Sequence, residues 1–166
     1  KSGKRYRKKG DQWLVEKTHF RGQWGISADD QGRLYYNSNE VNLEGDFFSP
    51  GLGATNKHQQ EVAGYDERIV HDNRVYPARP TPGVNRGYME GILDDSLRLV
   101  NFTAACSPLI YTITLFGKAF YGNAFVAEPA GNLIKRDILT DHGYTTSGEE
   151  AYAKEEFLAS EDERFR

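Results

Sequence analysis

The chain has 166 residues and a formal net charge of −3, so it is long enough to bury one core, and its overall charge identifies no class of partner. Hydrophobic residues make up only 38%, glycine occurs 17 times and aromatic residues reach 13%, which favours short strands and turns over a helical bundle. The single cysteine, Cys106, excludes an internal disulfide, and without a C-x-x-C-H motif this chain cannot carry covalent haem.

The two ends of the chain carry opposite charge. Six of the residues from Lys1 to Lys9 are basic, whereas the charged residues of 149–163 are mostly acidic. We expect residues 1–11 to form an exposed, solvated basic coil, with contact to phosphate or acidic lipid as the alternative. The segment from Trp13 to Phe20 then fits one strand, because it combines β-branched and aromatic residues without a breaker.

The stretch Trp24–Asn39 predicts a β-hairpin. Two short apolar runs flank the polar turn 28–33, in which Gly32 can adopt positive φ and Asp29 and Asp30 can bond their own backbone. These two aspartates could also ligate calcium together with carbonyl oxygens, but the turn lacks the dense acidic spacing of a loop that wraps the ion. Turn capping is therefore the favoured role.

Residues 41–98 predict a long insertion, because they contain most of the prolines and glycines and show little periodicity. Apolar runs typical of strands return at residues 99–106 and 109–116, which we expect to be buried strands. A second hairpin follows, with residues 122–127 and 132–139 flanking the turn 128–131, where Pro129 comes early and Gly131 late. Residues 149–158 form the one plausible short helix, and an edge segment is the alternative.

Five segments, which occur in this order, are more informative as sequence motifs than as physical patterns: GQWGISADDQGRLYYNSN, RPTPGVNRGY, FTAACSPLIY, YGNAFVAEPAGNLIKRDIL and EFLASEDERFR. Together they resemble the propeller region of the large haem-linked membrane-bound dehydrogenases of planctomycete-type bacteria. Those proteins look related to the pyrroloquinoline-quinone-dependent glucose and sorbosone dehydrogenases. The resemblance implies an all-β fold in which residues 12–166 form a partial β-propeller of about two to three blades, interrupted by the insertion 41–98.

The resemblance also implies partners and a location. An incomplete propeller exposes sheet edges and one inter-blade face, so we expect this chain to pack against the remainder of the propeller or other protein chains. It further implies a haem domain or cytochrome elsewhere and a periplasmic or other extracytoplasmic location. No apolar run approaches the length of a membrane span, and neither a signal peptide nor a nucleic-acid partner is expected.

His19 is the candidate catalytic residue. In the soluble quinone-dependent sugar dehydrogenases, a histidine just ahead of the blade strand removes the substrate hydroxyl proton, and His19 precedes Gly25–Asp29 in a similar arrangement. Neutral imidazole suits a general base near pH 7. A structural histidine at a strand end is the alternative.

Arg79, Asn85 and Arg86 are the candidate cofactor-binding residues. They lie in a loop stiffened by Pro80 and Pro82, which could present guanidinium groups to the carboxylates of a quinone cofactor. The alternative is that these arginines tie the insertion to the propeller through carbonyls and local acids. His58, His71 and His142 have no metal-ligand spacing, so no zinc site is predicted, and Cys106 is expected to be a packing thiol.

The sequence therefore yields two functional hypotheses. The first is the propeller segment of a quinone-dependent sugar or alcohol dehydrogenase that passes electrons to a haem domain elsewhere. The second is a non-catalytic binding or scaffold propeller in a larger extracytoplasmic assembly, with the loop from Val41 to Leu99 as its contact surface. Saturable binding of quinone would distinguish the first from the second.

Overall fold

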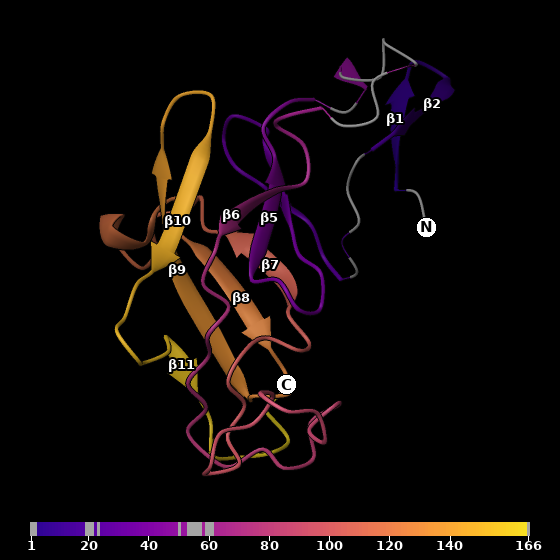
Figure 1. Cartoon of the computed structure of the whole chain (residues 1–166). Helices are drawn as coiled ribbons and strands as arrows, with labels where there is room; N and C mark the ends of the chain where they lie inside the picture. Colours follow the sequence, from indigo (N-terminus) through magenta and orange to yellow (C-terminus); the bar gives the residue numbers. More distant parts are fainter. Residues whose placement is uncertain are drawn as a thin grey trace.

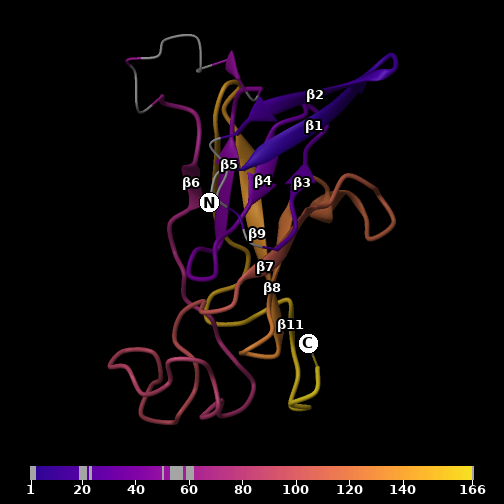
Figure 2. The ribbon, with the colours of Figure 1, turned by 90° about the vertical axis from the view of Figure 1, so that its right-hand side faces the viewer.

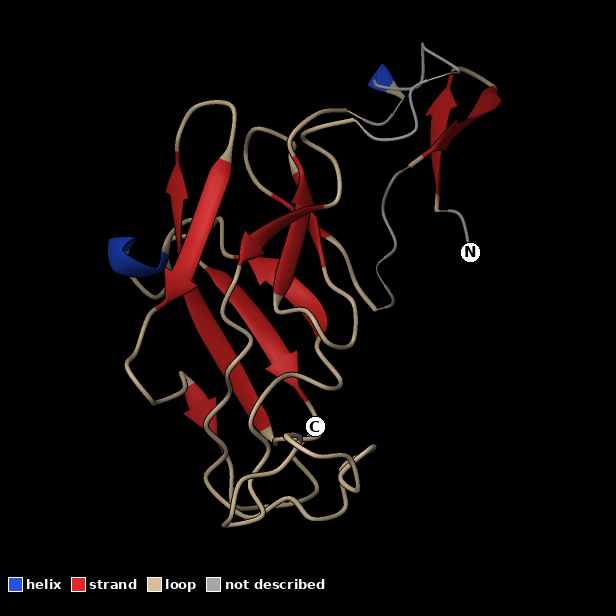
Figure 3. Cartoon of the chain, viewed as in Figure 1, coloured by secondary structure: helices blue, strands red, loops and turns tan. Residues whose placement is uncertain are grey.

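The computed structural model describes residues 3–18, 22, 24–49, 51–52, 58 and 62–165. The fold is all-β, with strands joined by loops, and the helix among its named elements is the short 3-10 helix η2, which precedes β8 (Figure 3). In chain order the elements are β1 (Lys4–Lys9), β2 (Gln12–Lys17), β3 (Ser27–Ala28), β4 (Leu34–Tyr36), β5 (Leu43–Asp46), β6 (Glu67–Val70), β7 (Cys106–Ile110), η2 (Lys118–Phe120), β8 (Ala124–Glu128), β9 (Leu133–Asp141), β10 (Thr146–Glu150) and β11 (Leu158–Ala159).

Two four-stranded antiparallel meanders form the body of the molecule. The first runs β3-β4-β5-β6 and the second runs β7-β8-β9-β10, with β11 added beside β9 (Figure 1). The meanders meet along one seam through a parallel pair between Val70 of β6 and Gly148 of β10. Along the other seam, the Ser107 amide donates to the Trp24 carbonyl at 2.7 Å. The result is one nearly closed, barrel-like sheet.

The core lies between the two meanders. Tyr35, Leu43 and Ile69 contribute from the first meander, and Val126 and Leu133 contribute from the second. The side chains of β9 alternate between the interior and the surface. Leu133, Lys135 and Asp137 are buried, while the residues between them are partly exposed. Its inward face therefore carries two charged residues into the interior.

Both hairpins that the sequence predicts are confirmed. Ser27 and Ala28 pair with Tyr35 and Leu34 across the turn of residues 29–33, and β8 pairs with β9 across residues 129–132. The strand expected over residues 13–20 is confirmed in part as β2, and residues 19 and 20 lie outside the described residues. No described helix is long and apolar enough to cross a membrane.

Several local expectations were wrong. The basic terminus is exposed, but residues 4–9 form strand β1 rather than coil, because they pair in register with β2. The insertion begins later than residue 41, since β5 and β6 belong to the first meander, and the irregular stretch between strands runs over residues 71–105. A single strand, β7, replaces the two expected over residues 99–116, and Pro108 sits at an irregularity in its register.

The C-terminal helix expected over residues 149–158 is also absent from the structure. Glu149 and Glu150 instead end β10, and Leu158 begins β11, because both segments pair with β9. The alternative of an edge segment is the one that the structure supports.

Candidate functional site

The irregular insertion, the β8–β9 turn and the C-terminal segment line a half-open cavity of about 520 Å³. Arg79 and Asn85 line it from the insertion, Asn132 from the turn, and Glu163 and Arg164 from the C-terminal segment. Two of the three residues expected to bind a cofactor are thus brought to one cavity. The sequence reasoning missed Asn132 and Arg164, which come from segments 53 and 85 positions away from Arg79.

Arg79 is held in position by three groups. Its Nε donates to Asn132 Oδ1 at 3.2 Å, and a terminal nitrogen donates to the carbonyl of Pro80 at 3.1 Å. Its other terminal nitrogen lies 3.8 Å from Glu163 Oε2, which is an ion pair beyond hydrogen-bonding distance. The guanidinium is therefore oriented while one of its edges remains weakly engaged.

Asn132 links the cavity walls. It adopts a positive φ of 55°, and its side-chain nitrogen, Nδ2, donates to the backbone carbonyls of Phe165 at 2.7 Å and Glu163 at 3.2 Å. These bonds fasten the C-terminal segment against the β8–β9 turn. The third expected cofactor residue, Arg86, forms an ion pair with Glu40 and is not among the residues that line the cavity.

Glu128 holds the backbone of residues that line the cavity. It ends β8 with no exposed surface, and its Oε2 accepts from the amides of Thr103 and Ala104, each at 2.8 Å. Its Oε1 accepts from the amide of Ala130 at 2.9 Å. Burial raises the pKa of this carboxyl, and the backbone donors oppose that rise. Glu128 thus fixes the backbone of two cavity-lining residues, Ala104 and Ala130.

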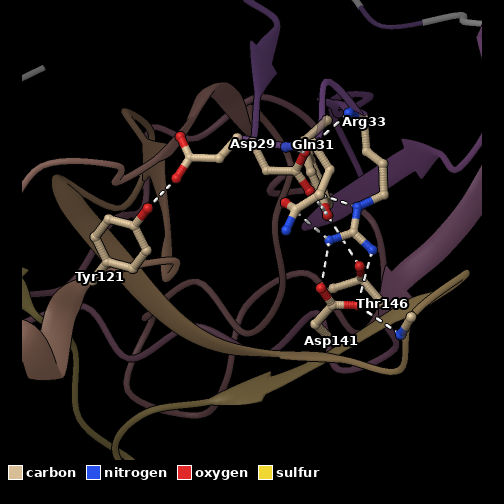
Figure 4. A network of polar contacts seen from close by, with 9 residues as sticks. Asp29, Gln31, Arg33, Tyr121, Asp141 and Thr146 are labelled. Carbon is tan, nitrogen blue, oxygen red and sulfur yellow. Dashed lines mark hydrogen bonds and ion pairs between the residues drawn. The ribbon is translucent and has the colours of Figure 1, made fainter.

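A second, smaller cavity of about 190 Å³ lies beside the first hairpin turn, at a polar network shown in Figure 4. Asp29 Oδ1 accepts from the amides of Gln31 and Arg33 at 3.0 and 2.9 Å, so its expected turn-capping role is confirmed. Asp29 Oδ2 accepts from Arg33 Nε at 2.6 Å and from the Tyr35 hydroxyl at 3.0 Å. Four protein donors therefore already occupy this carboxylate.

Arg33 connects that turn to the second meander. Its two terminal nitrogens donate to both carboxylate oxygens of Asp141, each at 3.1 Å. The hydrogen bonds from Arg33 lower the pKa of Asp141, while burial raises the pKa of Tyr35 to about 12. Tyr121 bonds Asp30 at the edge of the same cavity. The polar groups of this network have hydrogen-bond partners within the chain, and the network acts as a clamp that joins the two meanders.

A third polar cluster lies inside the sheet. Lys135 Nζ is 3.3 Å from Glu150 Oε2 and 3.7 Å from Glu156 Oε1, and the Tyr76 amide donates to Glu156 at 2.9 Å. Burial raises the pKa of neighbouring Asp137 to about 7, and the Lys135 ammonium opposes that shift. This cluster can hold or release a proton near neutral pH.

The remaining candidates contribute little chemistry. Cys106 is partly buried, and burial together with the charge of Glu128 raises the pKa of its thiol, as befits a packing residue. His19 lies outside the described residues. Within the described part of the chain, no three His, Cys, Asp or Glu side chains gather into a metal-binding group.

Comparison with known proteins gives one match. The family model described as "Domain of unknown function (DUF7133)" matches residues 1–166. No curated protein and no solved structure matches the chain.

Proposed function

We propose that this chain, which belongs to the DUF7133 family of domains of unknown function, is the propeller segment of a quinone-dependent sugar or alcohol dehydrogenase-like protein. One observation carries the proposal: Arg79 and Asn85 line the same cavity as Arg164 and Asn132. Guanidinium and amide donors converging on a cavity suit a ligand with several carboxylates. The volume of about 520 Å³ lies within the usual range for small-molecule sites, about 300–1,000 Å³.

The strand order supports the propeller part of the proposal. Each meander consists of four consecutive antiparallel strands, which is the composition of a propeller blade. Among the described residues, the seam between β6 and β10 has a single paired position, Val70 with Gly148, and the opposite seam is bridged by the hydrogen bond from the Ser107 amide to the Trp24 carbonyl. Two blades that pack face to face, with further blades supplied by other polypeptide, would account for this arrangement.

The residues around the cavity fit an anionic quinone better than they fit calcium. The weakly engaged edge of Arg79 can donate to a ligand carboxylate if Glu163 turns away. The side chain of Arg164 is 87% exposed and pairs with Asp162, so it would have to exchange that partner to contact a ligand. Glu163 is the one carboxylate among the residues that line the cavity, whereas calcium needs several oxygen ligands. Calcium therefore remains a weaker proposal than pyrroloquinoline quinone.

A quinone held there would supply a two-electron oxidant for the substrate hydroxyl, with a haem domain elsewhere as the onward electron acceptor. Arg79 would hold one end of the cofactor, Asn85 would donate from the insertion side, and Glu128 would keep the cavity floor rigid. His19 remains the proposed base for the substrate hydroxyl proton.

Calorimetric titration with pyrroloquinoline quinone tests the proposal. We expect saturable binding, weakened about tenfold or more by Arg79→Gln, because a charge-assisted hydrogen bond contributes about 1.5–3 kcal/mol. Asn85→Asp should also weaken binding, since it places a carboxylate at the exposed cavity wall. Arg98→Gln is the matched control, an exposed arginine outside this cavity. Absence of saturable binding, or equal affinity in all variants, would refute the cofactor assignment.

The scaffold function remains the second candidate because of one observation. The insertion exposes Tyr88 and Met89, with 90% and 48% of their surfaces accessible. Exposed apolar side chains on a loop are typical of protein contact surfaces. If the chain is a scaffold, quinone titration will show no saturable binding, while replacement of Tyr88 will weaken assembly.

A further inference from the structure

The β1–β2 hairpin presents an unusual face to solvent. Its register places Tyr6 opposite Val15 and Lys8 opposite Trp13, so these four side chains share one face. Tyr6, Trp13 and Val15 are 61%, 65% and 56% exposed. An aromatic and β-branched cluster this open is uncommon on a solvated hairpin and indicates a contact surface.

Charge on the hairpin is distributed unequally between its faces. On the opposite face, Glu16 pairs with Arg5 at 2.7 Å and with Arg7 at 3.2 Å. The apolar face has Lys4 and Lys17 at one end and Lys8 beside Trp13, and no acidic partner of these lysines occurs in the described part of the chain. The face is therefore apolar at its centre and cationic at its margin, which suits an acidic partner surface.

The rest of the chain offers such a surface. Residues 1–18 hold seven basic and two acidic side chains, whereas residues 19–166 hold 14 basic and 22 acidic ones. Residues 155–163 hold five acidic side chains, of which three are already engaged by basic groups of the chain: Glu156 with Lys135, Glu163 with Arg79, and Asp162 with Arg164. The other two, Glu155 and Glu161, are exposed and have no ion pair within the described ranges. Phe157 and Leu158, between them in sequence, are 36% and 38% exposed. This acidic edge combines apolar and anionic groups, as the hairpin combines apolar and cationic ones.

We propose that the β1–β2 hairpin of one copy docks on the acidic edge, residues 155–163, of a second copy. Figures 1 and 2 place the hairpin and β11 at opposite ends of the molecule, so the contact joins two chains. Strand β11 pairs with β9 alone, which leaves its outer edge open to a partner. The contact is head-to-tail, and repetition of it produces a ring or a series of larger oligomers.

Sedimentation equilibrium over a wide range of protein concentration tests the proposal. We expect the mean mass to rise with concentration and to fall at high ionic strength, because salt screens exposed charge pairs. Lys8→Glu with Lys17→Glu should weaken association about tenfold or more, and Glu155→Lys with Glu161→Lys should do the same. Lys9→Glu, on the opposite face of the hairpin, is the matched control and should leave association within about twofold of wild type.

A charge-swap variant provides the decisive comparison. A chain carrying all four reversals again has opposite charge on the two surfaces and should associate nearly as well as wild type. Failure of this rescue, or a wild-type chain that is monomeric at every concentration, would overturn the proposal. A monomeric chain that instead binds vesicles of anionic phospholipid or a single-stranded oligonucleotide through the hairpin would also overturn it, by assigning the face to another partner. Each altered side chain is exposed and outside the core, so loss of folding does not confuse the result.

Discussion

Arg33 and Asp141 lie 108 positions apart in the sequence, and two parallel hydrogen bonds of 3.1 Å join them across the two meanders. Arg33 belongs to the turn before β4, whereas Asp141 ends β9. Asp29 holds the third side of the same guanidinium, so one arginine fixes a local turn and a long-range junction together. Such a bidentate pair adds geometric specificity to the energy of its charge.

Replacement of Arg33 by Met should destabilise the fold by about 1–3 kcal/mol, because it leaves Asp29 without one of its main donors. Asp141→Asn should cost less, since Asp141 is 47% exposed and water can solvate the remaining guanidinium edge. Urea unfolding of both variants measures the difference. A larger loss in Asp141→Asn than in Arg33→Met would contradict this view of the clamp.

Acid should stabilise the chain through Asp137. Its folded pKa is raised by burial to about 7, above an unfolded value of about 3.9, so the folded state holds a proton that the unfolded state has released between these limits. The contribution of this carboxyl to stability is fully present below about pH 4. It is lost as pH rises toward 7.

Asp137→Asn keeps the shape of the side chain and removes the titration. The variant should gain stability relative to wild type between pH 5 and pH 8 by on the order of 2 kcal/mol, measured by urea unfolding at both values. Asp95→Asn is an exposed control that should show no such gain. If wild type and Asp137→Asn have parallel pH profiles, Asp137 does not bind a proton in the folded state.

The sequence could predict the two hairpins because their determinants are local. Asp29 caps a turn only a few residues long, and Asn132 supplies the positive φ of the second turn. The sequence could not predict the pairing of β10 and β11 with β9, since residues 149–158 also have a helix-compatible pattern and only tertiary contacts decide between the two.

The residues that line the candidate cavity show the same difference between local and long-range determinants. Pro80 and Pro82 mark a stiff loop, and this local signal predicts Arg79, Asn85 and Arg86 as cofactor-binding residues. Asn132 and Arg164 carry no local signal, because their roles arise when distant segments meet. The sequence pattern does not predict strands β5 and β6, because they are short and lie among turn-forming residues.

The seams of the sheet depend on close backbone approach at two glycines. A Cβ atom at Gly25 would lie 2.6 Å from the Cα atom of Ser107, where the sheet nearly closes. A Cβ atom at Gly148 would lie 2.7 Å from a side-chain methyl of Val70 and 2.8 Å from one of Leu139, so it would meet side chains rather than backbone. We therefore expect Gly25→Ala to destabilise the chain by about 2–4 kcal/mol and Gly148→Ala by less.

Gly117→Ala is the control for backbone strain, because Gly117 also has positive φ but has open space around it. Thermal unfolding followed by circular dichroism measures all three, and equal losses in Gly25→Ala and Gly117→Ala would show that strain alone, rather than closure of the sheet, requires glycine at the seam.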